Sequence, residues 1–284
     1  MISPQLVSVV VTTFNRSDAL LAVLDGLTDQ NDKNFEVVVA DDGSHNEHVQ
    51  AITQSMVAKQ LRIVHVWHPD AGFTLTRIRN RGVAATAGEY LVFLDGDCVP
   101  EVDFIARHRA LAEVGRFISG SRVLLSEALS KRITGGDEKI WGRSIGYWIK
   151  QRLLGHANKL SGLVRLPDWR GRLDKGLPWT RVRGCNMAVW RSDFEKVDGF
   201  DESFVGWGHE DADFVLRLHH AGIIRKNGFC ATEVFHLWHN EAVRLQASQN
   251  AKTVEARVLT DIILPTLGYS QVRHGDDAVI TRLG

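Results

Sequence analysis

The sequence lacks the features that mark disulfide-stapled, zinc-ribbon and membrane-spanning proteins. Its three cysteines, Cys98, Cys185 and Cys230, lie far apart in the 284 residues and form no C-x-x-C pair. Neither a disulfide framework nor a zinc ribbon is therefore expected. No apolar run approaches the length of about 18 residues that a transmembrane helix needs. The apolar run near the N-terminus follows no basic segment and is too short for a signal peptide. We therefore expect a cytoplasmic chain.

An excess of charge of one sign is also absent. Lysine plus arginine and aspartate plus glutamate each total 34, so the formal net charge is zero. The composition therefore gives no sign of a nucleic-acid binder. The charges are nevertheless unevenly placed, because residues 131–183 contain 13 basic and four acidic residues. We call this segment the basic insert.

The basic insert also contains an apolar stripe at helical spacing. The stripe consists of Trp141, Ile145, Trp148, Ile149, Leu153 and Leu154. It favours a helix that packs on the core and turns its basic face to solvent. The alternative is a surface that contacts an anionic acceptor or a membrane, with the protein held peripherally at the inner membrane.

Strand and helix patterns alternate over the first hundred residues. Strand patterns occupy residues 6–14, 35–40, 61–68 and 89–97, and helix patterns occupy residues 16–30, 49–60 and 74–88. Buried strands separated by helices indicate a parallel sheet with right-handed crossovers. In such sheets ligands bind beyond the carboxyl ends of the strands. Polar turns at residues 12–15, 41–44 and 95–97 would therefore meet in one site.

The turn after the fourth strand contains two carboxylates separated by one glycine. Asp95 and Asp97 could bind one divalent cation, Mg²⁺ or Mn²⁺, together with a phosphate group. An acidic turn at a strand end is the alternative, and the motif alone does not exclude it. His236 and His239, in the sequence FHLWHNE, are further candidate ligands for the same ion.

A second acidic group follows the sequence GWG. Glu210, Asp211 and Asp213 begin an expected amphipathic helix, where the helix dipole alone would favour acids. Two glycines around Trp207 are a poor choice for packing, however, and favour a ligand-stacking or lid role for the indole. A carboxylate held beside them could act as a general base.

Four ordered motifs resemble family 2 glycosyltransferases of the GT-A fold. They are VSVVVTTFNR, VVVADDGS, RIRNRGVAATAGEYLVFLDGD and NMAVWRSDFEKVDGFDESFVGWGHEDADFVLRL. The last motif is also similar to the catalytic half of β-1,4-galactosyltransferases and to bacterial polysaccharide-synthesising transferases. The resemblance implies one large α/β domain with a Rossmann-like, mostly parallel sheet flanked by helices. We expect a nucleotide-sugar-binding half in residues 1–104, an acceptor-binding and catalytic half in residues 105–240, and a helical segment and tail in residues 241–284.

The resemblance also implies roles for individual residues. Asp211 would be the catalytic base, and Glu210 its acceptor-binding neighbour. The metal ligands would be Asp97, Asp95 and one of the two histidines, with His236 preferred over His239. The donor pocket would be formed by Thr12, Thr13, Asn15, Asp41, Asp42, Arg79, Asn80, Asp95 and Trp207.

The implied activity is that of an inverting, metal-dependent hexosyltransferase. It would move a sugar from a nucleotide-sugar, a UDP-sugar in our interpretation, to a hydroxyl of a glycan or glycolipid in bacterial surface polysaccharide or lipopolysaccharide synthesis. A metal-dependent phosphohydrolase is an alternative, but it has no evident use for the GWG sequence. A catalytically inactive sugar-binding module is another, which the presence of both Asp97 and Asp211 disfavours. A Rossmann dehydrogenase is disfavoured because no G-x-G-x-x-G follows the first strand.

Overall fold

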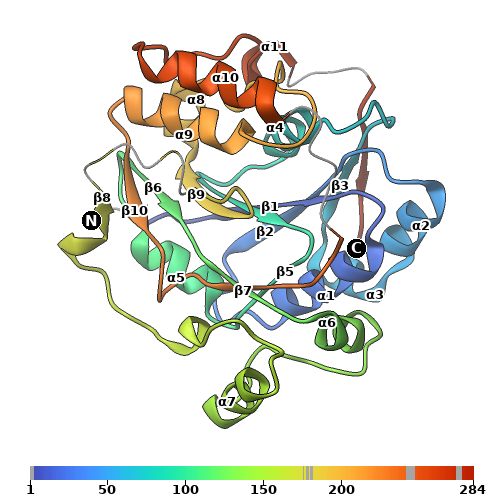
Figure 1. The fold of residues 1–284 in the computed structure, drawn as a ribbon. Coiled ribbons are helices and arrows are strands. Elements are labelled where there is room, and N and C mark those ends of the chain that lie inside the picture. Colours follow the sequence, from blue (N-terminus) through green and yellow to red (C-terminus); the bar gives the residue numbers. More distant parts are fainter. Residues whose placement is uncertain (1–2, 175, 177–178, 180–181, 241–246, 273–276) are drawn as a thin grey trace.

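The computed structural model describes residues 3–174, 176, 179, 182–240, 247–272 and 277–284. Its centre is a nine-stranded sheet with helices on both faces (Figure 1). In spatial order the strands are β12 (Val279–Arg282), β3 (Val64–Trp67), β2 (Phe35–Asp41), β1 (Val7–Thr13), β4 (Tyr90–Asp95), β9 (Asn186–Trp190), β6 (Arg116–Ser119), β10 (Ile224–Asn227) and β8 (Leu173–Asp174). A smaller sheet contains β5 (Cys98–Pro100), β11 (Val234–His236) and β7 (Arg122–Leu124).

Most strands of the large sheet run in one direction. The four strands predicted in the first hundred residues form its parallel part, in the order β3, β2, β1, β4. β9 is antiparallel to both β4 and β6, so β6 and its parallel neighbour β10 run the same way as β4. This mostly parallel α/β sheet confirms the predicted fold class. Because β4 pairs with β9, residues 1–104 and 105–240 share one sheet.

The helices lie in two layers, one on each face of the sheet (Figure 1). One layer contains α1 (Ser17–Thr28), α2 (Asn46–Gln54), α3 (Met56–Leu61), α5 (Phe104–Leu111), α6 (Glu127–Thr134) and α7 (Ile145–Leu153). The other contains α4 (Leu75–Ala84), α8 (Arg191–Lys196), α9 (Glu210–His220), α10 (Ala247–Val258) and α11 (Tyr269–Val272). No helix in the described part of the chain is long and apolar enough to cross a bilayer.

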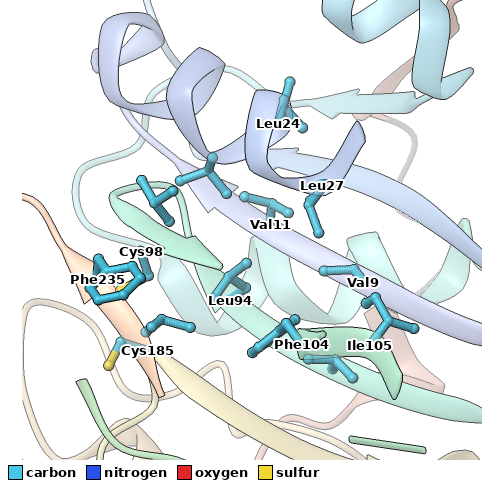
Figure 2. Packing of buried hydrophobic residues seen from close by; sticks show 14 of the residues in the cluster. Val9, Val11, Leu24, Leu27, Leu94, Cys98, Phe104, Ile105, Cys185 and Phe235 are labelled. Carbon is cyan, nitrogen blue, oxygen red and sulfur yellow. The ribbon is translucent and has the colours of Figure 1, made fainter. Parts of the chain in front are cut away.

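The core has one apolar layer on each face of the sheet. Figure 2 shows Leu24 and Leu27 of α1 packed over Val9 and Val11 of β1. Val10, which points to the opposite face, belongs to the other core cluster. A strand buried on both faces has no polar alternation, and this explains the uninterrupted run of valines in β1.

Two predicted helices differ in extent from those observed. The helix expected over residues 49–60 is two helices, α2 and α3, separated by Ser55 in an extended conformation. The Ser55 hydroxyl accepts a hydrogen bond from the Ala58 backbone N–H and so caps α3. Of the helical segment expected within residues 241–284, α10 covers the part from Ala247 to Val258. Residues 241–246 lie outside the described residues.

The apolar stripe of the basic insert is divided between core and solvent. Trp148 is buried, and its ring stacks on that of Phe235 with 4.2 Å between centroids. Ile145, Ile149 and Leu153, spaced four residues apart, are 65%, 44% and 82% exposed. The expectation that the stripe packs on the core is therefore wrong for these three residues, which lie on a side of α7 that faces away from it. It is also wrong for Leu154, which is 57% exposed.

A buried ion cluster attaches α10 to α9. Asp213 and Arg217 are both completely buried, and Arg217 Nε donates to Asp213 Oδ2 over 2.8 Å. The other oxygen of Asp213 accepts from Arg257 of α10, which also donates to Asp201 over 2.8 Å. Asp213 is therefore a structural residue, although it lies in the same helical turn as the predicted catalytic acids.

Replacing Asp213 should destabilise the fold strongly. Asp213→Ala leaves Arg217 buried without its carboxylate, and breaking such a buried pair costs about 3–5 kcal/mol in the free energy of unfolding. Urea titration followed by circular dichroism measures the change. The matched control is Glu255→Ala on the exposed side of α10, which should change stability by less than about 0.5 kcal/mol. Equal stability of the two variants would contradict the assignment.

Candidate active site

The three predicted polar turns meet at the carboxyl ends of β1, β2 and β4. Thr12 Oγ1 donates to Asp95 Oδ1 over 3.2 Å, and the Asn15 backbone N–H donates to Ser44 Oγ over 2.8 Å. The turn after β4 crosses the end of β1, where Gly96 N donates to the Thr12 carbonyl oxygen. A Cβ atom on Gly96 would lie 2.6 Å from that oxygen. The residue after Asp95 therefore has to be glycine.

Arg79, on α4, connects this turn to the second half of the chain. Its side chain is 1% exposed, and Nη2 donates to Asp95 Oδ1 over 3.0 Å and to the Gly184 carbonyl oxygen over 3.4 Å. Its Nε and Nη1 atoms have no hydrogen-bond partner among the described residues. A buried guanidinium with unused donors is suited to an anion in the site.

Asp97 lies beside two histidines because β11 pairs with β5. The pairing sets His236 opposite Cys98, and Leu237 N donates to the Asp97 carbonyl oxygen over 2.8 Å. Asp97 Oδ2 lies 3.7 Å from His236 Nε2 and 3.2 Å from His239 Nε2. The ligand atoms of Asp97, Cys98 and His236 all lie within 4.8 Å of one another. The structure therefore brings three predicted metal ligands together, Asp97, His236 and His239. The fourth, Asp95, contacts Thr12 and Arg79 instead.

The chemistry of this cluster fits a divalent cation. Burial lowers the pKa of His236, which favours the neutral imidazole that can bind a metal. Burial also raises the pKa of the Cys98 thiol well above its usual range, and a protonated thiol is a weak ligand. The carboxylate oxygens and imidazole nitrogens that remain suit Mn²⁺, and the oxygens suit Mg²⁺. The sequence interpretation treated Cys98 as an isolated thiol, although its position directly after Asp97 was a signal.

The two acids of the ADDGS turn are engaged by neighbouring side chains. Asp41 Oδ2 lies 3.0 Å from His65 Nε2, and Asp42 Oδ1 lies 2.9 Å from His68 Nε2. Asp42 also accepts hydrogen bonds from the hydroxyl and the backbone N–H of Thr74. These contacts hold the turn against β3 and the start of α4. Sequence reasoning missed both histidines, whose only signal was their position in the strand pattern of residues 61–68.

Three other predicted donor-pocket residues differ in what they contact. Asn15 has a left-handed backbone, with φ of 51°, and its side chain accepts from His45 N over 2.9 Å. Asn80 is completely buried, and its amide bonds to the backbone of Phe200 and to Glu202. Thr13 is buried, with no hydrogen-bond partner for its hydroxyl among the described residues. A direct role in donor binding stays a prediction for all three.

Asp211 approaches the first half of the site through Gly184. Asp211 Oδ2 accepts from the Gly184 backbone N–H over 2.8 Å, and the Gly184 carbonyl accepts from Arg79. A Cβ atom on Gly184 would lie 3.1 Å from the Asp211 side chain and 3.2 Å from Arg79 Nη1. Trp207, 38% exposed, precedes α9 between two glycines with positive φ. A single residue, Gly184, therefore connects the predicted base to the Arg79–Asp95 pair.

Comparison with known proteins agrees with this geometry. The model of glycosyl transferase family 2 matches residues 8–155, which is about half of the chain, and that of the N-terminal domain of galactosyltransferase matches residues 171–240. The chain is a family 2 glycosyltransferase. Validoxylamine A glucosyltransferase of Streptomyces hygroscopicus subsp. jinggangensis is 30% identical over 77% of this chain and 52% of its own length. Chondroitin synthase of Escherichia coli is 28% identical over 76% of this chain. The family 2 chain spans about half the length of the first relative and 32% of the second.

Solved structures support the GT-A fold of this family 2 glycosyltransferase. The mannosyltransferase PcManGT of Pyrobaculum calidifontis, solved with GDP-Man and Mn²⁺, has a TM-score of 0.54 at 16% identity, covering 92% of this chain and 72% of that one. TarS of S. aureus has a TM-score of 0.60 at 14% identity, covering 94% of this chain and 41% of that one. At these identities the likeness concerns the fold alone.

Glu210, the first residue of α9, has a perturbed acidity in the family 2 chain. Burial, the larger cause, and the charge of Asp211 together raise the pKa of Glu210 to about 7. Its Oε2 accepts a hydrogen bond from Gly208 N over 3.1 Å. A carboxyl that resists ionisation near neutral pH can donate a hydrogen bond to a ligand.

The raised pKa of Glu210 predicts a pH-dependent loss of stability. The folded state binds more protons than the unfolded state between about pH 4.5 and 7, so stability falls as pH rises through that window. Glu210→Gln should remove the cost: the variant should be a few kcal/mol more stable than the wild type at pH 8 and equally stable near pH 4, since one pKa unit corresponds to about 1.4 kcal/mol. Urea unfolding of the ligand-free protein across this range measures it.

The control is Glu195→Gln on α8, an exposed position, which should follow the wild type at every pH. A difference between Glu210→Gln and the wild type that did not change with pH would show that the Glu210 carboxyl titrates normally.

Proposed function

We propose that this chain transfers a sugar from a nucleotide-sugar, a UDP-sugar, to a hydroxyl of a glycan or glycolipid, with inversion at the anomeric carbon. The observation that carries the proposal is the arrangement around Gly184, whose backbone N–H binds Asp211 and whose carbonyl binds Arg79 beside Asp95. It brings a candidate base next to a candidate donor site. The phosphohydrolase alternative is not favoured, because family matches and relatives are glycosyltransferases.

In this mechanism Asp211 accepts the proton of the acceptor hydroxyl as that oxygen attacks the anomeric carbon. The Gly184 N–H holds Asp211 Oδ2 in place, which fixes the direction of attack. One displacement from the face opposite the leaving group inverts the configuration. The Nε and Nη1 groups of Arg79, which no described residue engages, would stabilise charge that develops on the departing nucleoside diphosphate. Trp207 would stack on a sugar ring.

A divalent ion beside Asp97 would suit a reaction with a negatively charged leaving group. Asp97 and His236, with His239 and Asp95 as neighbours, would hold Mn²⁺ or Mg²⁺. When bound, the ion neutralises charge on the diphosphate. The solved complex of PcManGT with GDP-Man and Mn²⁺ supports a nucleotide-sugar and a divalent ion for this chain as well.

Donor binding and turnover should separate in two variants. Calorimetric titration with UDP should show binding that requires Mn²⁺ and disappears with EDTA. Asp97→Asn should weaken this metal-dependent binding. Asp211→Asn should retain it and reduce transfer by about 10²–10⁴, the range for loss of a general base. Transfer is followed as nucleoside diphosphate released from a panel of sugar nucleotides and glycan acceptors.

Asp261→Asn, at an exposed position, is the matched control and should leave both measurements unchanged. Full turnover in Asp211→Asn would exclude it as the base. Failure of UDP and GDP to bind with or without metal would exclude the donor site, and binding of GDP alone would replace UDP in the proposal.

We also propose peripheral contact with the cytoplasmic face of the inner membrane, consistent with a glycolipid or surface-polysaccharide acceptor. Ile145, Ile149 and Leu153 form an exposed ridge along α7, and Lys150 and Arg152 are exposed on its two sides. The sequence from residue 139 to residue 167 contains six lysine and arginine residues and no acidic residue. An aliphatic ridge flanked by cations is the pattern of a helix that lies in an anionic membrane surface. Figure 1 shows α7 at the periphery of the molecule.

Vesicle binding tests this contact. The protein should cosediment with vesicles that contain phosphatidylglycerol, and more weakly with pure phosphatidylcholine. The double variant Ile149→Glu/Leu153→Glu should lose at least about tenfold in affinity, because burying each of these side chains is worth about 1.5–3 kcal/mol. The matched control is Leu259→Glu, at a leucine that is 90% exposed outside α7. Equal sedimentation of the double variant and the wild type would refute the contact.

A further inference from the structure

A cavity lined by cations lies beside the candidate active site. Its volume is about 410 Å³, within the range of small-molecule sites. Among the described residues that line it none is acidic, and four are basic: Arg122, Lys159, Arg183 and Arg225. Arg225 forms an ion pair with the half-exposed Asp174 at 3.1 Å. The cavity therefore has an excess of positive charge that suits an anionic ligand.

The strand order places this cavity at the same edge of the sheet as the three polar turns of the candidate active site. Its wall includes Gly120 and Ser121, which directly follow β6, and Asn227, the last residue of β10. β6 and β10 run in the same direction as β4, so their carboxyl ends lie along one edge. The cavity is thus a continuation of the predicted site, on the side of β4 away from the ADDGS turn.

Two wall residues connect the cavity to the reacting groups. Arg183 is the neighbour of Gly184, whose N–H holds Asp211. Leu124 of β7 pairs in register with His236 of β11. A ligand in the cavity would therefore lie between the candidate base and the candidate metal ligands. An attacking acceptor needs this position.

The wall is also suited to a sugar ring. Phe229 and Leu124 are 47% and 41% exposed and supply apolar surface. The Lys159 ammonium lies 5.3 Å from the Phe229 ring centroid and donates to the Ser121 hydroxyl. Apolar surface next to amide, hydroxyl and cationic donors is the combination that binds a pyranose with a charged substituent.

We propose that this cavity is the acceptor subsite and that it takes a sugar residue carrying an anionic group, a carboxylate or a phosphate. The proposal rests on the glycosyl transfer proposed above. The cations would pair with the anionic group and so direct a hydroxyl of the same sugar toward Asp211. Neutral sugars of the same shape would bind more weakly, because they carry no negative charge to interact with Arg122, Lys159 and Arg183.

Ligand-observed NMR in the presence of UDP and Mn²⁺ tests the proposal with glucuronate, glucose 6-phosphate, glucose and inorganic phosphate as probes. At least one of the two anionic sugars should bind about tenfold more tightly than glucose and than inorganic phosphate, and the tighter one identifies the charged group. The double variant Lys159→Gln/Arg183→Gln should weaken that binding about tenfold, whereas Lys252→Gln, at an exposed position, should not.

Calorimetry with UDP and Mn²⁺ separates this proposal from the donor assignment. Unchanged UDP binding in the double variant supports an acceptor subsite, and a loss of UDP binding would assign the cavity to the donor and overturn the proposal. Glucose or inorganic phosphate binding as tightly as the tighter of the two anionic sugars would also overturn it. If wild-type protein binds an anionic sugar but no nucleotide, the glycosyl transfer proposal fails while the anion site stands.

Discussion

Arg79 lies between the two halves of the site, and its guanidinium is almost completely buried. Burying such a charge is costly unless it is paired, and here the partners come from distant parts of the chain, Asp95 at the end of β4 and Gly184 before β9. Gly184 in turn holds Asp211. The position of the candidate base therefore depends on this one cation. Its Nε and Nη1 atoms have no hydrogen-bond partner in the described part of the chain.

The parts of this arrangement that could be predicted from sequence are those with local causes. Strands buried on both faces appear in the sequence as unbroken apolar runs. The runs of β1, β2 and β4 therefore predicted the centre of the sheet and the meeting of the three polar turns at its edge. The sequence D-G-D marks the turn after β4 because only glycine fits against the Thr12 carbonyl. The resemblance to family 2 glycosyltransferases added the roles of Asp211 and His236, which spacing alone did not distinguish from a helix dipole effect or a structural histidine.

The parts that could not be predicted depend on contacts between distant segments. Cys98 faces His236 only because β5 and β11 pair in that register. Asp211 and Asp213 are two residues apart on α9, and successive helical residues are rotated by about 100°, so they face different directions. Arg217 and Arg257 around Asp213 decide which of the two acids is structural. Likewise the helical spacing in the basic insert predicted α7 correctly, but not that its aliphatic ridge faces solvent.

The basic residues of the basic insert lie on two surfaces, the cavity and the ridge of α7, and a short segment of the chain connects the two. Lys159 lines the cavity, while Lys150 and Arg152 flank the ridge of α7. The chain between them is tied to β7, because Asn158 N donates to the Leu124 carbonyl and the Asn158 side chain accepts from Leu124 N. The helix and the cavity are thus attached to the same strand next to the metal ligands. Under the two proposals, the acceptor would be anchored in the bilayer beneath α7, and its anionic sugar would lie in the cavity. Because both α7 and the cavity are attached to β7, this strand would fix the distance between that sugar and the membrane.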